Sequence, residues 1–182
     1  MTQYLVGIDI GGTKLATVVA DNNGTILHKV RQPTEARYGS DHVVRKLIQM
    51  VDQMLALVGI SRSQISAIGI SCGGPLDTTT GIVYSPPNLP DWDAVPLKKI
   101  VTTEFQVPTV IENDANASAY AEWKFGGGQG YDEVVFMTMS TGIGAGIVSK
   151  GQIYHGASDC AGEVGHQILI PNGPLCGCGN RG

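Results

Sequence analysis

The first third of the chain alternates between short apolar runs and polar turns. Apolar, β-branched runs occupy residues 4–8, 15–20 and 25–31, and the turns between them are rich in glycine and asparagine. Runs of this length with such turns predict three strands of an antiparallel meander. From residue 41 to 58 the apolar side chains instead recur every three or four positions, ahead of Gly59. This spacing predicts a helix with one buried face that packs on the sheet.

The rest of the chain continues the alternation of strands and helices. A buried strand at 65–70 ends in the glycine-rich segment 71–75, and a proline-rich stretch at 85–92 predicts an extended loop. The further predicted elements are a helix at 96–105, a strand at 109–111, a helix that opens just after Asn113-Asp114 and ends at Gly126, and strands at 134–137 and 145–148. The order β-β-β-α-β-α-β-α predicts an α/β lobe over residues 1–118. Residues 119–182 then begin a second lobe.

Composition and charge restrict the partners of the chain. It has 182 residues, of which 42% are hydrophobic, so a sizeable core is expected. A net charge of -4 with scattered Lys and Arg argues against nucleic acid as a direct partner. No apolar run approaches the ~20 residues of a membrane span, and no secretory signal precedes the first strand, so we expect a cytoplasmic protein. In that reducing compartment the cysteines at 72, 160, 176 and 178 are expected to be free thiols or metal ligands.

The turn after the first strand has the chemistry of a phosphate-binding loop. Asp9-Ile10-Gly11-Gly12-Thr13-Lys14 combines a carboxylate, glycines, a hydroxyl and an ammonium group. A strand follows this turn, whereas a Walker loop or a dinucleotide-binding turn opens a helix, so both of those assignments are excluded. A phosphate loop between antiparallel strands is similar to that of actin-like, Hsp70-like and hexokinase-like phosphotransferases. An ordinary hairpin turn is the alternative. A second strand-loop-strand, with Ser140-Thr141-Gly142-Ile143-Gly144 at its tip, repeats the pattern and predicts a two-sided clamp on one nucleotide.

Two further clusters carry candidate chemistry. Asp114 lies at a strand-to-helix junction, where its carboxylate could accept the proton of an attacking hydroxyl or simply cap the helix. Glu163 and His166 lie three residues apart among glycines, so both can reach one polar ligand, although a buried structural histidine is the alternative. Cys176 and Cys178, with His166 upstream, could supply three ligands of a tetrahedral zinc site. A Cys-x-Cys pair alone is weak support for a metal.

Taken together, the ordered motifs resemble one protein family. Besides the Asp9 and Ser140 loops, they are Glu112-Asn113-Asp114-Ala115-Asn116, Gly162-Glu163-Val164-Gly165-His166 and Cys176-Gly177-Cys178-Gly179-Asn180-Arg181-Gly182. In order and spacing they resemble the ROK family, most of all its bacterial glucokinase and N-acylhexosamine kinase branches. The resemblance covers the chain from end to end. It implies the actin-like ATPase (ribonuclease H-like) fold of two lobes.

The resemblance also implies a role for each matching residue. Residues implied to hold the nucleotide phosphates and magnesium are Asp9, Gly11, Gly12, Thr13 and Lys14 in the first loop, and Thr141, Gly142 and Gly144 in the second. Residues implied to contact the sugar are Gly74, Asn88, Asn113, Asp114, Glu163 and His166. Asp114 is implied to be the general base toward the sugar hydroxyl on C6. Three of the four ligands of a structural zinc ion are implied to be His166, Cys176 and Cys178.

The resemblance implies an ATP-dependent hexose kinase that uses Mg²⁺ and a structural Zn²⁺ and forms a homo-oligomer, most simply a dimer. A sugar-responsive regulator and a catalytically silent sugar- or zinc-binding fragment are the alternatives. The family motif continues past Gly182 with another cysteine and a sugar-contacting glutamate, so we expect the 182-residue chain to be truncated within the zinc motif. The proline-rich loop resembles that of the glucokinase side of the family, which implies glucose as the preferred hexose.

Overall fold

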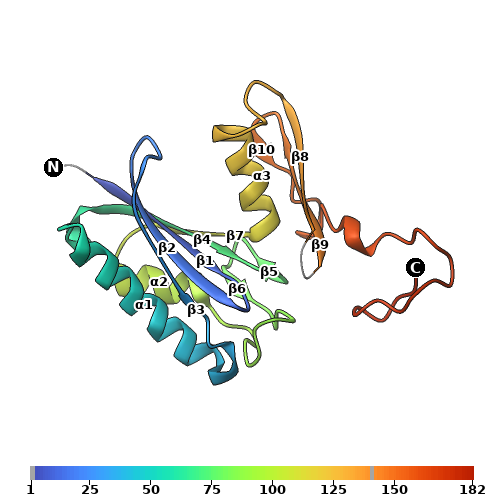
Figure 1. Ribbon diagram of the computed structural model, residues 1–182, viewed down its shortest axis with the longest axis horizontal. Helices are drawn as coiled ribbons and strands as arrows, with labels where there is room; N and C mark the ends of the chain where they lie inside the picture. The colour runs from blue at the N-terminus through green and yellow to red at the C-terminus, as the bar shows by residue number, and fades with distance from the viewer. Residues whose placement is uncertain (1–2, 140–141) are drawn as a thin grey trace. The chain divides into compact units, whose positions relative to one another are not determined.

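The computed structural model describes residues 3–139 and 142–182. Its contacts divide the chain into two compact units, Met1–Asp114 and Ala115–Gly182, called here the first and second unit (Figure 1). The division falls four residues before the boundary expected from the sequence. The functional assignment of two lobes stays a prediction, and each unit is described by itself.

The first unit is built on a mixed five-stranded sheet in the order β3-β2-β1-β4-β7. Its strands are β1 (Tyr4–Ile10), β2 (Lys14–Asp21), β3 (Ile26–Pro33), β4 (Ile65–Cys72) and β7 (Thr109–Asn113). The first three form the predicted antiparallel meander, and β1, β4 and β7 run parallel. The sequence therefore predicted every strand of this sheet, with ends a few residues short.

One face of this sheet is buried beneath helices α1 (Gly39–Leu57) and α2 (Leu97–Phe105) (Figure 1). Alternate side chains of β1, among them Val6, Ile8 and Ile10, point to the same core as Leu47 of α1 and Val101 of α2. Every second side chain of the strand faces this core, and so do the helix side chains that recur every three or four residues. This packing fixes the strands in place, and with them the loops that follow their carboxyl ends.

The parallel strands end together at one edge of the sheet. Ile10 of β1 is in register with Cys72 of β4, and Cys72 with Asn113 of β7. Loops that follow the carboxyl ends of neighbouring parallel strands are therefore brought side by side, as in other open α/β sheets.

A short hairpin follows β4 and was not predicted from the sequence. Strands β5 (Leu76–Asp77) and β6 (Ile82–Val83) pair antiparallel. The Asp77 carboxylate accepts hydrogen bonds from the backbone N–H groups of Thr79 and Thr80 at 2.8 and 2.9 Å, and these bonds lower the pKa of Asp77. Such a turn is fixed by its aspartate rather than by apolar periodicity, because the strands are too short to show a period.

The second unit pairs a helix with a three-stranded antiparallel sheet in the order β10-β9-β8. Its elements are α3 (Asp114–Phe125), β8 (Glu133–Met139), β9 (Ile143–Ser149) and β10 (Gln152–Ile153). A Cβ atom at Gly146 of β9 would collide with Ala115 and Ala119, so glycine there lets the helix lie directly on the strand. Beyond β10 the regular structure that is described is the 3-10 turn η3 (Val164–His166).

One face of β8 is apolar and exposed. Val135, Met137 and Met139 are 63%, 54% and 75% exposed.

Within the described parts of the chain, no helix has the length and apolarity needed to cross a membrane.

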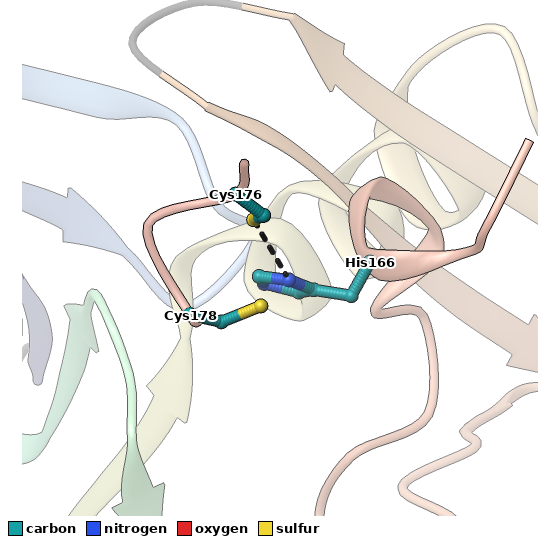
Figure 2. Close-up of side chains that lie close together, drawn as sticks. All are labelled: His166, Cys176 and Cys178. Carbon is teal, nitrogen blue, oxygen red and sulfur yellow. Dashed lines mark hydrogen bonds between the residues drawn. The ribbon is translucent and has the colours of Figure 1, made fainter. Parts of the chain in front are cut away.

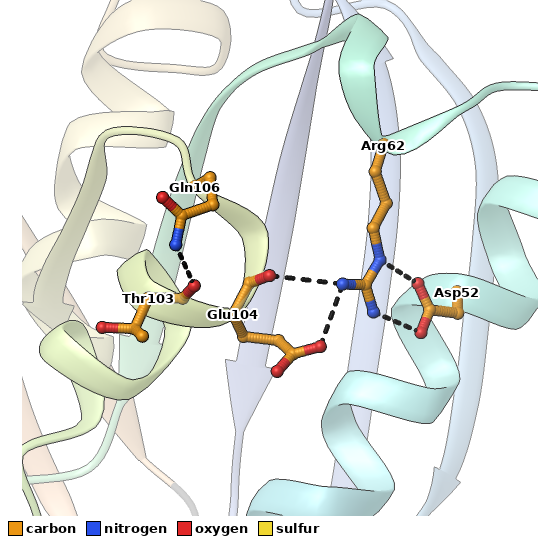
Figure 3. A network of polar contacts seen from close by, with 5 residues as sticks. All are labelled: Asp52, Arg62, Thr103, Glu104 and Gln106. Carbon is orange, nitrogen blue, oxygen red and sulfur yellow. Dashed lines mark hydrogen bonds and ion pairs between the residues drawn. The ribbon is translucent and has the colours of Figure 1, made fainter.

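Arg62 joins three elements at the opposite end of the first sheet (Figure 3). Its guanidinium Nε and Nη2 donate to the two carboxylate oxygens of Asp52 at 2.7 and 2.6 Å. Its Nη1 donates to the Glu104 carboxylate at 2.9 Å, and the guanidinium lies 4.5 Å from the centre of the Phe105 ring. The contacts tie the C-terminal halves of α1 and α2 to the 3-10 turn η2 (Arg62–Gln64), which directly precedes β4.

We expect Arg62→Ala to lower the free energy of unfolding by about 1–2 kcal/mol, because each partly exposed ion pair contributes little while the bidentate fork and ring contact add to it. Urea unfolding measures the change. Arg45→Ala, at an exposed position of α1, is the matched control and should have almost no effect. Arg62→Lys should recover only part of the loss, because an ammonium group cannot make the paired contact. Equal effects at positions 45 and 62 would contradict this role.

Candidate functional site

The glycine turn between β1 and β2 is closed by its own backbone and lies against the proline-rich loop. The Gly11 N–H donates to the Lys14 carbonyl at 3.0 Å. A Cβ atom on Gly12 would lie 2.5 Å from Asn88 Cβ and 2.7 Å from the Asn88 carbonyl oxygen. Two segments that the sequence placed in different roles, one for phosphates and one for the sugar, are thus in direct contact.

Two carboxylates lie near one buried thiol at the carboxyl edge of the sheet. Asp9 is exposed at the end of β1, and its Oδ1 accepts a hydrogen bond from the Ser71 hydroxyl at 3.1 Å. Burial, together with the negative charges of Asp114 and Asp9, raises the pKa of the Cys72 thiol to about 12. Cys72 is therefore a neutral thiol at this edge of the sheet, and the carboxylates of Asp9 and Asp114 near it are exposed.

The remaining sugar-contact candidates of the first unit gather at the same edge. A Cβ atom at Gly74 would lie 3.4 Å from the Asn113 side-chain nitrogen, so the glycine-rich exit of β4 and the end of β7 are adjacent. The Glu112 carboxylate accepts the Asn113 backbone N–H at 2.8 Å, which fixes the chain just before Asp114. Thr13 and Lys14 are exposed at the start of β2.

In the second unit, β9 positions the segment that carries Glu163 and His166. The Ala145 N–H donates to the Gly162 carbonyl at 2.9 Å, and a Cβ atom at Gly165 would collide with the Ile143 carbonyl. These close approaches hold the turn η3 on the strand. The Glu163 carboxylate then lies 3.6 Å from His166 Nε2, with both side chains about half exposed.

His166, Cys176 and Cys178 form a compact cluster in the second unit (Figure 2). One ligand atom from each residue lies within 4.8 Å of the others, and Cys176 Sγ is 3.7 Å from His166 Nδ1. A tight turn brings the thiols together, because the Gly179 N–H donates to the Cys176 carbonyl at 2.9 Å. Hydrogen bonds from the Asn180 backbone, and then from Cys176 and His166, lower the pKa of Cys178 to about 7.

A Cys₂His donor set of this spacing fits zinc, which prefers thiolate and imidazole ligands in tetrahedral sites. The two ring nitrogens of His166 face different groups: Nδ1 lies near Cys176 and Nε2 near Glu163. A histidine held in this way can serve a metal with one nitrogen and a carboxylate with the other.

The predicted site residues fall into the two units. The first holds Asp9, Gly11, Gly12, Thr13, Lys14, Gly74, Asn88, Asn113 and Asp114; the second holds Gly142, Gly144, Glu163, His166, Cys176 and Cys178. Thr141 lies outside the described residues. The clamp formed by both phosphate loops stays a prediction.

Two residues that contact the site were not predicted from the sequence. Ser71 donates a hydrogen bond to Asp9 and lies near the end of β4, in the glycine-rich segment 71–75, where no sequence signal indicated this contact. Thr34 binds the glycine turn from 23 positions away and had no sequence signal.

Comparison with known proteins decides the family. The sequence profile of the ROK family matches residues 5–182. The chain belongs to the ROK family. A glucokinase of Streptomyces coelicolor is 41% identical over 179 residues, which are 97% of this chain and 53% of that protein. This ROK chain also matches a xylose repressor of Bacillus spizizenii, at 34% identity over 98% of the chain and 46% of the repressor.

Solved structures share the fold of this ROK chain. The crystal structure of a ROK hexokinase from Thermus thermophilus matches with a TM-score of 0.85 and 38% identity, over 99% of this chain and 58% of the other. A ROK family glucokinase from Streptomyces griseus, in complex with glucose and AMPPNP, gives a TM-score of 0.81 and 37% identity over 98% and 55% of the two chains. The predicted actin-like ATPase fold is thereby confirmed. The chain spans about half the length of these relatives.

Proposed function

We propose that this ROK protein is an ATP-dependent hexose kinase in which Asp114 is the general base. The observation that carries the proposal is the edge of the first sheet, where the glycine turn, Asp9 and Asp114 come from strands that end in register. The relatives named glucokinase and hexokinase support the same chemistry.

The reaction follows from these groups. The Asp114 carboxylate accepts the proton of the sugar hydroxyl on C6 while the oxygen of that hydroxyl attacks the γ-phosphorus of ATP. The new O–P bond forms as the bond to the β,γ-bridging oxygen breaks, and ADP leaves with that oxygen. Backbone N–H groups of the glycine turn and the Lys14 ammonium face the charge on the phosphoryl oxygens. In this mechanism the protein acts mainly by stabilising the negative charge on the transferred phosphoryl group, and it forms no covalent intermediate.

Magnesium and the sugar need different groups at this edge. Asp9 offers an exposed carboxylate held in place by Ser71, which suits Mg²⁺, a cation that prefers oxygen ligands. When bound, the ion would neutralise charge on the phosphates. Asn88 and Asn113 offer amide donors and acceptors suited to sugar hydroxyls. Glu163 and His166, whose carboxylate and imidazole lie 3.6 Å apart in the second unit, stay predicted sugar contacts.

Release of ADP, coupled to NADH oxidation and measured with a panel of hexoses and N-acylhexosamines, tests the proposal. We expect turnover with Mg·ATP and a hexose, with glucose as the preferred acceptor. The sugar phosphate should carry its phosphate on C6, which ³¹P and ¹³C NMR can assign. A protein that binds Mg·ATP and glucose but transfers no phosphoryl group to any sugar would refute the kinase proposal.

We infer also that His166, Cys176 and Cys178 bind a zinc ion. At about pH 8, without zinc, a thiol reagent should modify Cys178 first, because its pKa of about 7 leaves it mainly as thiolate. The reaction should slow as the pH falls below 7. Cys72 should stay unmodified in the folded protein, since it is buried with a pKa of about 12.

Zinc should protect Cys176 and Cys178 but not the exposed Cys160, which serves as the internal control. Mass spectrometry of the modified peptides measures each rate. His166→Ala should abolish the protection. If zinc protected neither thiol of the wild-type protein, the zinc assignment would be wrong, whatever the result for kinase activity.

The match to a xylose repressor supports a second candidate, a sugar-responsive regulator. It predicts that the protein binds a sugar tightly and never turns it over with ATP. Calorimetric sugar binding beside the ADP assay separates the two functions.

A further inference from the structure

Thr34 makes both of its polar contacts with the glycine turn. It follows β3 directly and is 0% exposed. Its hydroxyl donates to the Gly11 carbonyl at 2.5 Å, and its backbone N–H donates to the Thr13 carbonyl at 3.0 Å. One residue from a distant part of the sequence thus holds the carbonyl groups on both sides of Gly12.

The contact with Gly11 fixes the direction of one N–H group. In a trans peptide the C=O of one residue and the N–H of the next point to opposite sides of the chain. Because Thr34 holds the Gly11 carbonyl toward the buried side, the Gly12 N–H is directed the other way. Over the residues that the structure describes, the N–H groups of Gly12 and Thr13 have no hydrogen-bond partner. Successive N–H groups of this kind form an anion-binding turn.

Helix α1 holds the backbone on either side of Thr34. The Lys46 ammonium donates to the Pro33 carbonyl at 2.7 Å and lies 3.0 Å from the Glu35 carboxylate. His42 Nε2 lies 2.9 Å from the same carboxylate, and these two partners lower the pKa of Glu35, His42 most of all. Thr34 is therefore a rigid support rather than a free side chain that happens to reach the turn.

We propose that Thr34 is the positioning residue of the phosphate loop: its hydroxyl sets the plane of the Gly11–Gly12 peptide, so that the Gly12 N–H is presented to a phosphoryl oxygen of the nucleotide. The inference rests on the proposed function, because that function supplies the phosphate ligand. It assigns to Thr34 no contact with the nucleotide itself.

Thr34→Val removes the hydroxyl and keeps the shape of the side chain. The dissociation constant of Mg·AMPPNP, measured by calorimetry, should rise about tenfold or more, the range expected when a hydrogen bond to a charged group is lost. The dissociation constant of glucose should stay within about twofold, because this substitution releases the Gly11 carbonyl but adds no atom between Gly12 and Asn88. Thr34→Ser, which keeps the donor, should bind both ligands like the wild type.

Thr17 provides a matched control in the same sheet. It is also 0% exposed, but among the residues with a described placement its hydroxyl has no hydrogen-bond partner. Thr17→Val makes the same chemical change and should leave both affinities unchanged, with a melting temperature equal to or above that of the wild type. In ¹H–¹⁵N spectra the Gly12 amide signal should shift in Thr34→Val and not in Thr17→Val. If Thr34→Val does not fold, Thr34→Ala takes its place.

The outcomes separate this inference from the proposed function. Wild-type affinity for Mg·AMPPNP in Thr34→Val, or equal weakening of nucleotide and glucose, would overturn the positioning role and leave the kinase proposal standing. Nucleotide binding that depends on Thr34, in a protein that phosphorylates no sugar, would overturn the kinase proposal alone. A wild-type protein that does not bind Mg·AMPPNP would overturn both.

Discussion

Asp114→Asn is expected to reduce kcat by about 10²–10⁴-fold while the KM values for ATP and glucose change little. Asparagine has the shape of aspartate but cannot accept the proton of the attacking hydroxyl. A loss confined to kcat is the signature of a group that acts in the transition state rather than in binding. Steady-state ADP release, with both substrates varied, measures the split.

Asp132→Asn is the matched control, because Asp132 is an exposed carboxylate in the loop before β8. It should leave kcat and both KM values unchanged. Near-normal turnover in Asp114→Asn would remove Asp114 from the role of base and favour its alternative role as a helix cap. In that case Asp114→Ala should lower the free energy of unfolding by about 1 kcal/mol, whereas Asp114→Asn should not, because asparagine caps a helix as well as aspartate does.

The sequence predicted the main sheet of the first unit because its strands are long enough to show their pattern. Alternating burial in β1 and the three-and-four spacing of α1 each report on one buried face, and the structure confirms both. The β5–β6 hairpin was missed because its strands have two residues each and its turn depends on one aspartate. A burial pattern can be recognised only over several residues, whereas a turn held by one side chain can form between very short strands.

The candidate site was predicted unevenly for a related reason. Motifs that are contiguous in sequence, such as the turn from Asp9 to Lys14, could be found before the structure was known. Ser71 and Thr34 could not, because their roles come from strand register and from a contact across the sheet. The proximity of Gly12 to Asn88 likewise follows from the fold and not from either segment alone.

That proximity predicts that Gly12→Ala disturbs two binding segments at once. The backbone of Gly12 does not have a positive φ, so space rather than backbone angle excludes the side chain. The added Cβ would meet the Asn88 carbonyl at 2.7 Å, well inside van der Waals contact. The Asn88 loop cannot move away easily, because its Leu89 and Trp92 are buried in the core.

The strain should therefore displace the phosphate turn and the sugar loop together. We expect KM to rise about tenfold or more for both ATP and glucose, with kcat/KM reduced about 100-fold or more, since displacements near 1 Å at a reacting site have effects of that size. Overpacking should also lower the free energy of unfolding by about 1–3 kcal/mol. Kinetics with both substrates and urea unfolding measure these changes.

Gly69→Ala is the control, because a Cβ atom there would have no neighbour within 4 Å in the described chain. It should leave both KM values unchanged. Asn88→Ala should raise KM for glucose only, because it removes the amide and leaves the turn in place. If Gly12→Ala raised KM for ATP alone, the turn would be yielding while the loop stays fixed. The two binding segments would then be neighbours without being coupled, and sugar recognition would not depend on the conformation of the phosphate turn.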